Sequence, residues 1–292
     1  MPDIDGTNDG PPTDPNKIVG LVHPTPNAFD NLPDMQKSSP QHQLGIQRVG
    51  ITDLKIPIRM SKKGGGEEHT VADVNIFVDL DKFAKGTHMS RLAIGAFKFI
   101  NHSFNSETLI DIAEYIRKKC EAKTSHMIYK FPYFMDRIAP ISKEPGLIHC
   151  NCTFDLVKTE HDYTFSMSIE ATATSLCPCS REISEAGAHN QRSKIKITLV
   201  PKKDKWVWIE DIVSIAENNS SCEIYSVLKR TDEKYVTEKA YANPNFVEDM
   251  VRAVYKSLSL NDDLKSFVVE VTNEESIHQH NAYAMMDTVY GE

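Results

Sequence analysis

The chain has 292 residues, of which 40% are hydrophobic and 25% charged, with a formal net charge of −8 at pH 7. This composition is typical of a globular protein with one large domain or two fused modules, and no apolar run reaches the roughly 18 residues that a membrane helix needs. The negative charge disfavours non-specific nucleic-acid binding, and the first twenty residues lack a secretory signal, so we expect a cytoplasmic protein without nucleic-acid or membrane partners.

The first segment of the chain, residues 1–40, is acidic and rich in proline, which predicts a disordered arm. Two β-rich runs follow, over residues 49–60 and 70–81, and the glycine-rich turn at 61–69 joins them. Apolar and polar side chains alternate through the second run, as they do in a strand with one buried face. This stretch therefore predicts a β-hairpin.

Two helices are predicted next, one beginning near His88 and one over residues 106–120 with Ser106 as its N-cap. An irregular, proline-containing stretch separates them from two strands, at 147–157 and 163–174. The second of these alternates apolar side chains with serine, threonine and glutamate, which is typical of a strand with one wet face.

The same order then recurs. A strand is predicted over residues 193–201, and amphipathic helices over 208–218 and 243–259, the latter with Asn243 as its cap and Pro244 in its first turn. A closing strand begins at residue 266. Because strands and helices come in adjacent pairs, we predict an antiparallel α+β fold in which two strands, two helices and two strands occur twice. The predicted units are an arm at 1–40, a first half at 41–160 and a second half at 161–292.

A polar loop between two of these strands contains Cys177, Pro178, Cys179 and, twelve positions after the first cysteine, His189. The six cysteines are too sparse and uneven for a disulfide framework in a chain without an export signal. Buried structural thiols, metal ligation and redox chemistry all remain open for this loop on the residues alone.

Two further polar clusters stand out. Glu275, His278 and His280 follow the closing strand, and if that strand continues the two histidines share a face. Lys229, Arg230 and Glu233 belong to a stretch that we interpret as a charged loop. Each cluster by itself is equally compatible with solvated surface side chains.

Taken in order, these motifs resemble one known family. The motifs are QHQLGIQRVGITDLKIPI, GTHMSRL, TSLCPCSREIS with GAHNQRS, LKRTDEKYVTE, NPNFVEDMVRAVYKSL and ESIHQHNAYA. From about Gln41 to about Tyr283 the chain looks like the GTP cyclohydrolase type IB family. The resemblance implies the tunnelling fold, with two tandem ββααββ-like halves, antiparallel sheets and helices on one face. It also implies a homotetramer with active sites at the subunit interfaces.

The resemblance further implies a set of site residues. The metal ligands fall on Cys177, His189, Glu233 and His278, a mixture of thiolate, imidazole and carboxylate that suits Mn²⁺, Zn²⁺ or Fe²⁺. Glu248 matches the glutamate that anchors the guanine ring. Candidates for general acid/base or supporting roles are Cys179, Glu275 and His280, and candidates for holding the triphosphate are His88, Arg91, Arg192, Lys229 and Arg230.

The activity that the resemblance implies is conversion of GTP to 7,8-dihydroneopterin triphosphate and formate, the first step of folate and pterin biosynthesis. Three alternatives stay open. A related enzyme type makes a cyclic phosphate of dihydroneopterin, and a protein of the same fold could bind a purine or pterin without turnover. In the third alternative, Cys177 and His189 belong to a structural zinc site whose loss would unfold the protein.

Overall fold

The computed structural model describes residue 36 and residues 38–288, so the predicted arm at 1–40 lies almost entirely outside the described residues. The strands are β1 (Ile46–Ser61), β2 (Glu67–Leu80), β3 (Thr124–Ile138), β4 (Pro145–Thr159), β5 (Tyr163–Leu176), β6 (Asn190–Pro201), β7 (Cys222–Glu223), β8 (Leu264–Glu274) and β9 (Ala282–Asp287). The helices are α1 (Met89–Lys98), α2 (Ser106–Lys119), α3 (Pro178–Ile183), α4 (Ile209–Asn218), α5 (Arg230–Ala242) and α6 (Val247–Ser259).

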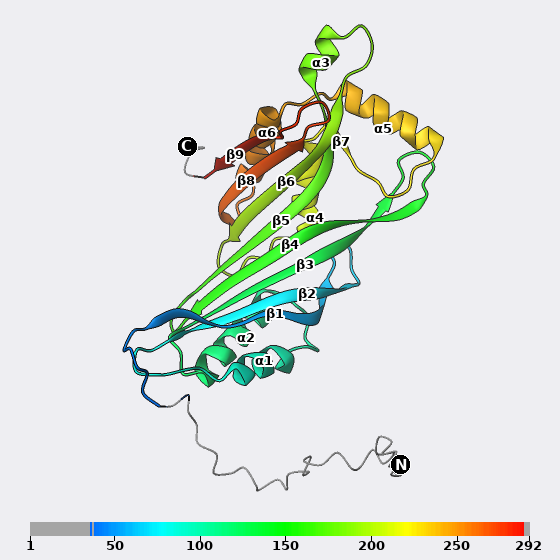
Figure 1. Cartoon of the computed structure of the whole chain (residues 1–292). Helices are drawn as coiled ribbons and strands as arrows, with labels where there is room; N and C mark the ends of the chain where they lie inside the picture. The colour runs from blue at the N-terminus through cyan, green and yellow to red at the C-terminus, as the bar shows by residue number, and fades with distance from the viewer. Residues whose placement is uncertain (1–35, 37, 289–292) are drawn as a thin grey trace, which may run out of the picture.

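One twisted sheet runs through the whole molecule (Figure 1) in the order β1-β2-β3-β4-β5-β6-β8-β9, with the short β7 beside β5. All its strand pairs are antiparallel. The element order is ββααββ in β1 to β4, and it recurs from β5 to β9 with α3, β7 and α5 added. The predicted antiparallel α+β fold with two ββααββ halves is confirmed, and the pairing of β4 with β5 joins the halves into a continuous sheet.

The sheet buries one face because its strands alternate apolar and polar side chains. In β5, the side chains of Phe165, Met167 and Ile169 are buried, while those of the intervening residues are partly exposed. Helices α2, α4 and α6 pack on the buried face through their own apolar stripes. Each large side chain removed from water in this way contributes about 1.5–3 kcal/mol.

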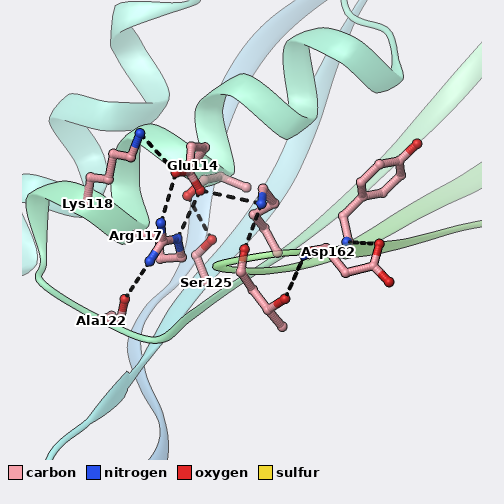
Figure 2. Close-up of polar contacts among 10 residues, drawn as sticks. Glu114, Arg117, Lys118, Ala122, Ser125 and Asp162 are labelled. Carbon is pink, nitrogen blue, oxygen red and sulfur yellow. Dashed lines mark hydrogen bonds and ion pairs between the residues drawn. The ribbon is translucent and has the colours of Figure 1, made fainter. Parts of the chain in front are cut away.

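Helix α2 is also tied to the sheet by charge (Figure 2). The Glu114 carboxylate accepts hydrogen bonds from Nε and Nη2 of Arg117, both at 2.9 Å, and pairs with Lys118 at 3.1 Å and with Lys158 of β4 at 3.6 Å. The Arg117 hydrogen bond is the main reason why the pKa of Glu114 falls to about 2, although partial burial opposes the shift. Below the helix, Ser125 Oγ of β3 donates to the Ala113 carbonyl at 2.8 Å.

The stretch predicted to be irregular before residue 147 is the long strand β3. Proline is ordinarily restricted to sheet edges because it lacks an N–H donor. Pro132 therefore argued against a strand here, and β3 was not predicted from the sequence. The pairing between β2 and β3 ends at Lys130, so Pro132 lies beyond that ladder and pairs only with Asn151 of β4. At Pro132, β3 therefore pairs with a neighbouring strand on one side only.

Three predicted element boundaries were wrong. Asn105, not Ser106, caps α2, and its side chain accepts from the Thr108 N–H at 2.9 Å. Residues 230–242, part of which we interpreted as a charged loop, form α5. Since α5 runs to Ala242, Asn243 ends that helix and α6 begins only at Val247, after Phe246.

The closing strand is also divided in two. Strand β8 ends at Glu274, and Ala282 of β9 pairs with Asn273 of β8, so the chain must reverse over residues 275–281. No helix among the described residues is long and apolar enough to cross a membrane.

Candidate functional site

Three connections meet at one end of the sheet (Figure 1): the β5–β6 loop with α3, the β8–β9 turn, and the region where α5 gives way to α6. Strand pairing fixes the ends of the β5–β6 loop, because Leu176 at the end of β5 lies opposite Asn190 at the start of β6. The segment between α5 and α6 is held by a hydrogen bond from the Asn245 N–H to the Leu176 carbonyl at 3.0 Å. The cysteine-containing loop and the start of α6 are therefore neighbours.

The β5–β6 loop holds its cysteine and histidine together through backbone contacts. The Cys177 N–H donates to the His189 carbonyl at 3.1 Å, which closes the base of the loop. Cys177 is the N-cap of α3, and its Sγ accepts from the Ser180 N–H at 3.5 Å. Ser180 Oγ in turn accepts from the His189 N–H at 3.2 Å. The thiol and the imidazole thus belong to one small hydrogen-bonded unit, both half-buried.

The ring of His189 is oriented by a buried glutamine. Gln191 Oε1 lies 3.0 Å from His189 Nδ1, and Ser276 Oγ of the β8–β9 turn approaches the same nitrogen at 3.5 Å. When Nδ1 carries the proton and donates it to Gln191, the lone pair of Nε2 is left available for a ligand. The contact with Ser276 also joins the two loops.

The β8–β9 turn carries His278 and His280, both exposed. Their rings stack with centroids 5.3 Å apart and planes inclined by 14°. The condition for the predicted shared face, that the closing strand continues, is not met, because β8 ends at Glu274 and residues 275–281 form a turn. The two imidazoles nevertheless lie side by side, and Glu275, the first residue after β8, is half-buried.

Helix α5 carries Glu233 in its first turn, where this side chain is exposed. Its neighbour Asp232 is fully buried and accepts from the backbone N–H groups of Ile141, Ser142 and Lys229, at 2.8, 2.8 and 2.9 Å. Burial of Asp232 opposes ionisation, but these hydrogen bonds and one from Ser142 Oγ hold its pKa below the ordinary value. The start of α5 is therefore fastened to the β3–β4 turn.

The other end of α5 is anchored by an ion pair between Lys239 and Glu223 of β7, which also accepts from Tyr225 Oη at 2.7 Å. Desolvation of the Glu223 carboxyl would raise its pKa, but the hydrogen bonds from Lys239 and Tyr225 lower it to about 2. Glu233 thus projects from a helix that is held at both ends.

Glu248 lies in the first turn of α6, exposed to solvent. Residues Val247, Met250 and Val251 of the same helix are buried, so the apolar stripe of α6 directs Glu248 away from the core. Glu248 lies three residues after Asn245, whose N–H donates to the Leu176 carbonyl.

The predicted triphosphate-binding residues are dispersed. His88 and Arg91 lie at the start of α1, following β2, at the sheet end opposite to Cys177 in this chain. Arg91 Nη1 donates to the Lys119 carbonyl at 2.8 Å, so this guanidinium also caps α2. Lys229 pairs with Glu144 of the β3–β4 turn. Arg192 lies exposed in β6 opposite Glu274, and Arg230 is exposed at the start of α5.

Across residues 36 and 38–288, no three His, Cys, Asp or Glu side chains are close enough together to hold a metal ion. The chemistry of the donors nevertheless fits a borderline divalent ion, because a thiol, an imidazole with an available Nε2 and further imidazoles meet at this end of the sheet. The set of Cys177, His189, Glu233 and His278 stays a prediction.

The sequence reasoning overlooked the residues that support this site, namely Gln191, Ser276, Asp232 and Glu223. A signal existed for one of them. Gln191 is two residues after His189, and residues two apart on an extended chain share a face. Asp232, Glu223 and Ser276 support the site through partners distant in the chain, and local spacing gives no signal for those contacts.

Sequence comparison identifies the family. The family model for type I GTP cyclohydrolase folE2 matches residues 32–284. The chain is 42% identical over 259 residues to GTP cyclohydrolase FolE2 of Nitrosococcus oceani, covering 88% of this chain and 95% of the relative. It is 41% identical over 260 residues to GTP cyclohydrolase FolE2 of Geobacter metallireducens, covering 88% and 97%. The protein is an α+β member of the cyclohydrolases, and it belongs to the type I GTP cyclohydrolase FolE2 family, also termed type IB.

Among solved structures, uricase from Arthrobacter globiformis aligns with a TM-score of 0.49 at 9% sequence identity, covering 84% of this chain and 93% of the uricase.

Proposed function

We propose that this chain converts GTP to 7,8-dihydroneopterin triphosphate and formate with the help of a divalent metal ion held by Cys177, His189, Glu233 and His278. Membership of the FolE2 family gives the cyclohydrolase activity. The observation that carries the residue assignment is the hydrogen-bonded unit of Cys177, Ser180 and His189, next to the β8–β9 turn with its histidines. We further propose a cytoplasmic location and duplicated halves at 41–160 and 161–292.

The protein's own residues would have separate roles in the reaction. A divalent ion bound here supplies a Lewis acid that activates water for attack at purine C8. Glu248 is suited to hold the guanine, because one carboxylate can accept paired N–H bonds from N1 and the 2-amino group. His280, Glu275 and Cys179 lie close in sequence to the proposed ligands and are candidates to move protons at the opening ring.

The candidate cations for the triphosphate are divided between the two ends of the strands. Arg192, Lys229 and Arg230 belong to the half that carries Cys177, whereas His88 and Arg91 lie at the opposite end of the strands. A 14-residue strand such as β5 spans about 45 Å, too far for one GTP molecule. We therefore propose a homotetramer in which the start of α1 from one subunit completes the site of another.

The proposal is tested by stripping the protein of metal, adding back Mn²⁺, Zn²⁺ or Fe²⁺ separately, and measuring formate and the oxidised pterin from GTP. Metal-dependent formate together with a triphosphate-bearing pterin is expected. Cys177→Ala and His189→Ala should each lower kcat by about 100-fold or more, since each removes a ligand from the ion that activates water.

Three results discriminate the alternatives. A cyclic phosphate product would identify the related enzyme type, and a folded protein that binds GTP but releases no formate with any metal would be a binding protein. If metal removal unfolds the chain, as judged by circular dichroism, the ion is structural. Cys150→Ala is a control for the loss of a thiol, because Cys150 packs in the hydrophobic core on β4, 3.7 Å from the sulfur of Cys152, and lies outside the β5–β6 loop.

A further inference from the structure

Helix α3 follows directly after Cys177, its N-cap, yet it has no hydrophobic anchor of its own. None of its residues is buried, and the last one, Ile183, is 84% exposed. In Figure 1, α3 projects beyond the ends of β5 and β6. Helices in proteins are ordinarily held by burial of an apolar stripe. Because α3 lacks such a stripe, other contacts must hold it in place.

The hydrogen bonds of α3 stay within the β5–β6 loop. The Cys177 carbonyl accepts from the Arg181 N–H and from Ser180 Oγ, both at 3.2 Å. Ser180 Oγ also accepts from the His189 N–H. These bonds hold the thiol beside the imidazole, but none of them reaches another helix.

One side chain of α3 does reach another helix. The guanidinium carbon of Arg181 lies 4.8 Å from the ring centroid of Tyr241, in the last turn of α5. This distance is within the roughly 6 Å over which a cation is attracted to the face of an aromatic ring. Both side chains are at the surface, Arg181 half-buried and Tyr241 exposed. Over the described ranges, Tyr241 is the one polar or ring partner that an α3 side chain has outside the β5–β6 loop.

Tyr241 belongs to a segment that is itself fixed in place. The ion pair between Lys239 and β7 anchors this end of α5. Just after Tyr241 the chain passes through Asn245, whose N–H donates to the end of β5, and enters α6 with Glu248 in its first turn. The contact between Arg181 and Tyr241 therefore connects the helix capped by Cys177 with the segment that leads to Glu248.

We infer that Arg181 is a positioning residue that sets the place of Cys177 relative to Glu248. The inference rests on the proposed function, in which Cys177 holds the metal that activates water at purine C8 and Glu248 holds N1 and the 2-amino group. These groups act at opposite ends of one purine, so the separation of Cys177 from Glu248 decides how well the water is aligned with C8. Small displacements of such groups lower the rate of the chemical step without removing a binding contact.

The test measures kcat and KM for GTP in the metal-loaded full chain, and metal affinity by competition with a chelator. Arg181→Ala should lower kcat about fivefold, as suits the loss of one cation–π contact, and leave KM and metal affinity within about twofold of the parent chain. Arg181→Lys keeps a cation and should recover most of kcat. Tyr241→Phe keeps the ring and should behave like the parent chain, whereas Tyr241→Leu should resemble Arg181→Ala.

The double variant Arg181→Ala/Tyr241→Leu should be no slower than either single variant, because both changes remove the same contact. Arg252→Ala is the matched control, since this exposed arginine of α6 pairs only with its helix neighbour Asp249. An unchanged kcat in Arg181→Ala, or equal losses in Tyr241→Phe and Tyr241→Leu, overturns the inference.

Two further results would also overturn it. A raised KM with unchanged kcat in Arg181→Ala would mean that Arg181 contacts GTP directly, and a loss of metal affinity as large as in Cys177→Ala would mean that it supports the metal instead. Failure of the proposed function is recognised separately, because the parent chain itself would then release no formate with any metal, and the inference would fall with it.

Discussion

At the scale of single residues, the metal site that we propose depends on how one imidazole is oriented. His189 can present Nε2 to a metal only while Nδ1 is occupied, and Gln191 Oε1 at 3.0 Å provides that partner. Gln191 is buried, so its side-chain amide has little freedom to move away from His189. We therefore assign Gln191 a positioning role.

Gln191→Ala should weaken metal binding by about 10- to 100-fold, the usual effect of losing such a supporting hydrogen bond. Competition with a chelator measures this affinity directly, independently of turnover. Gln191→Glu keeps an acceptor and should restore it, while the exposed Gln47 offers a control, Gln47→Ala, with no expected change. Unaltered metal affinity in Gln191→Ala would contradict the assignment.

At the scale of elements, helix α5 is placed by the buried carboxylate of Asp232. The depressed pKa of Asp232 means that its ionised form stabilises the fold above the unfolded pKa of about 3.9. This contribution is lost as the pH falls through the folded pKa. Acidification should therefore loosen the start of α5, and with it Glu233.

Asp232→Asn should lower the thermal midpoint by several degrees at neutral pH, because an amide has one acceptor oxygen where the carboxylate has two. The difference from the parent chain should shrink as the pH falls below the unfolded pKa of about 3.9, and it should vanish once the pH is below the depressed folded pKa, where the parent carboxyl is protonated as well. Scanning calorimetry at fixed protein concentration measures both. Asp249→Asn, which alters an exposed acid of α6, is the control. A difference that grows on acidification would refute this account of Asp232.

At the scale of the whole molecule, the separation of His88 from Cys177 predicts that active sites are shared between subunits. Chains with His88→Ala and chains with Cys177→Ala should each be nearly inactive alone. When they are co-assembled in equal amounts, about a quarter of the sites would combine an intact His88 with an intact Cys177 from different chains. The recovered formate production measures that fraction.

The pairing of Cys177→Ala with His189→Ala supplies the control for this experiment. Both changes are on one loop of one chain, so mixed assemblies should recover no activity through shared sites. Equal recovery in both mixtures, or none in either, would show that His88 and Cys177 do not complement each other across an interface.

The sequence by itself determined the features that arise from local periodicity and from motif order. Alternation in β2 and β5 and the apolar stripe of α2 reflect burial of one face, which local spacing encodes. The motif order was sufficient to indicate the family, and with it the proposed ligands. A predicted helix boundary was wrong where one helix closely follows another, as at Asn243. An asparagine there can end the first helix or begin the second, and the sequence does not distinguish the two.

Only the tertiary structure decided what surrounds these residues. Strand β3 pairs with β2 over part of its length, which accommodates Pro132, and Asp232 meets donors about 90 residues away in the chain. Arg181 of α3 meets Tyr241 of α5 because the end of β5 and the segment before α6 lie together. Such contacts depend on which surfaces meet after folding, and hydrophobic periodicity along the chain carries no information about that meeting.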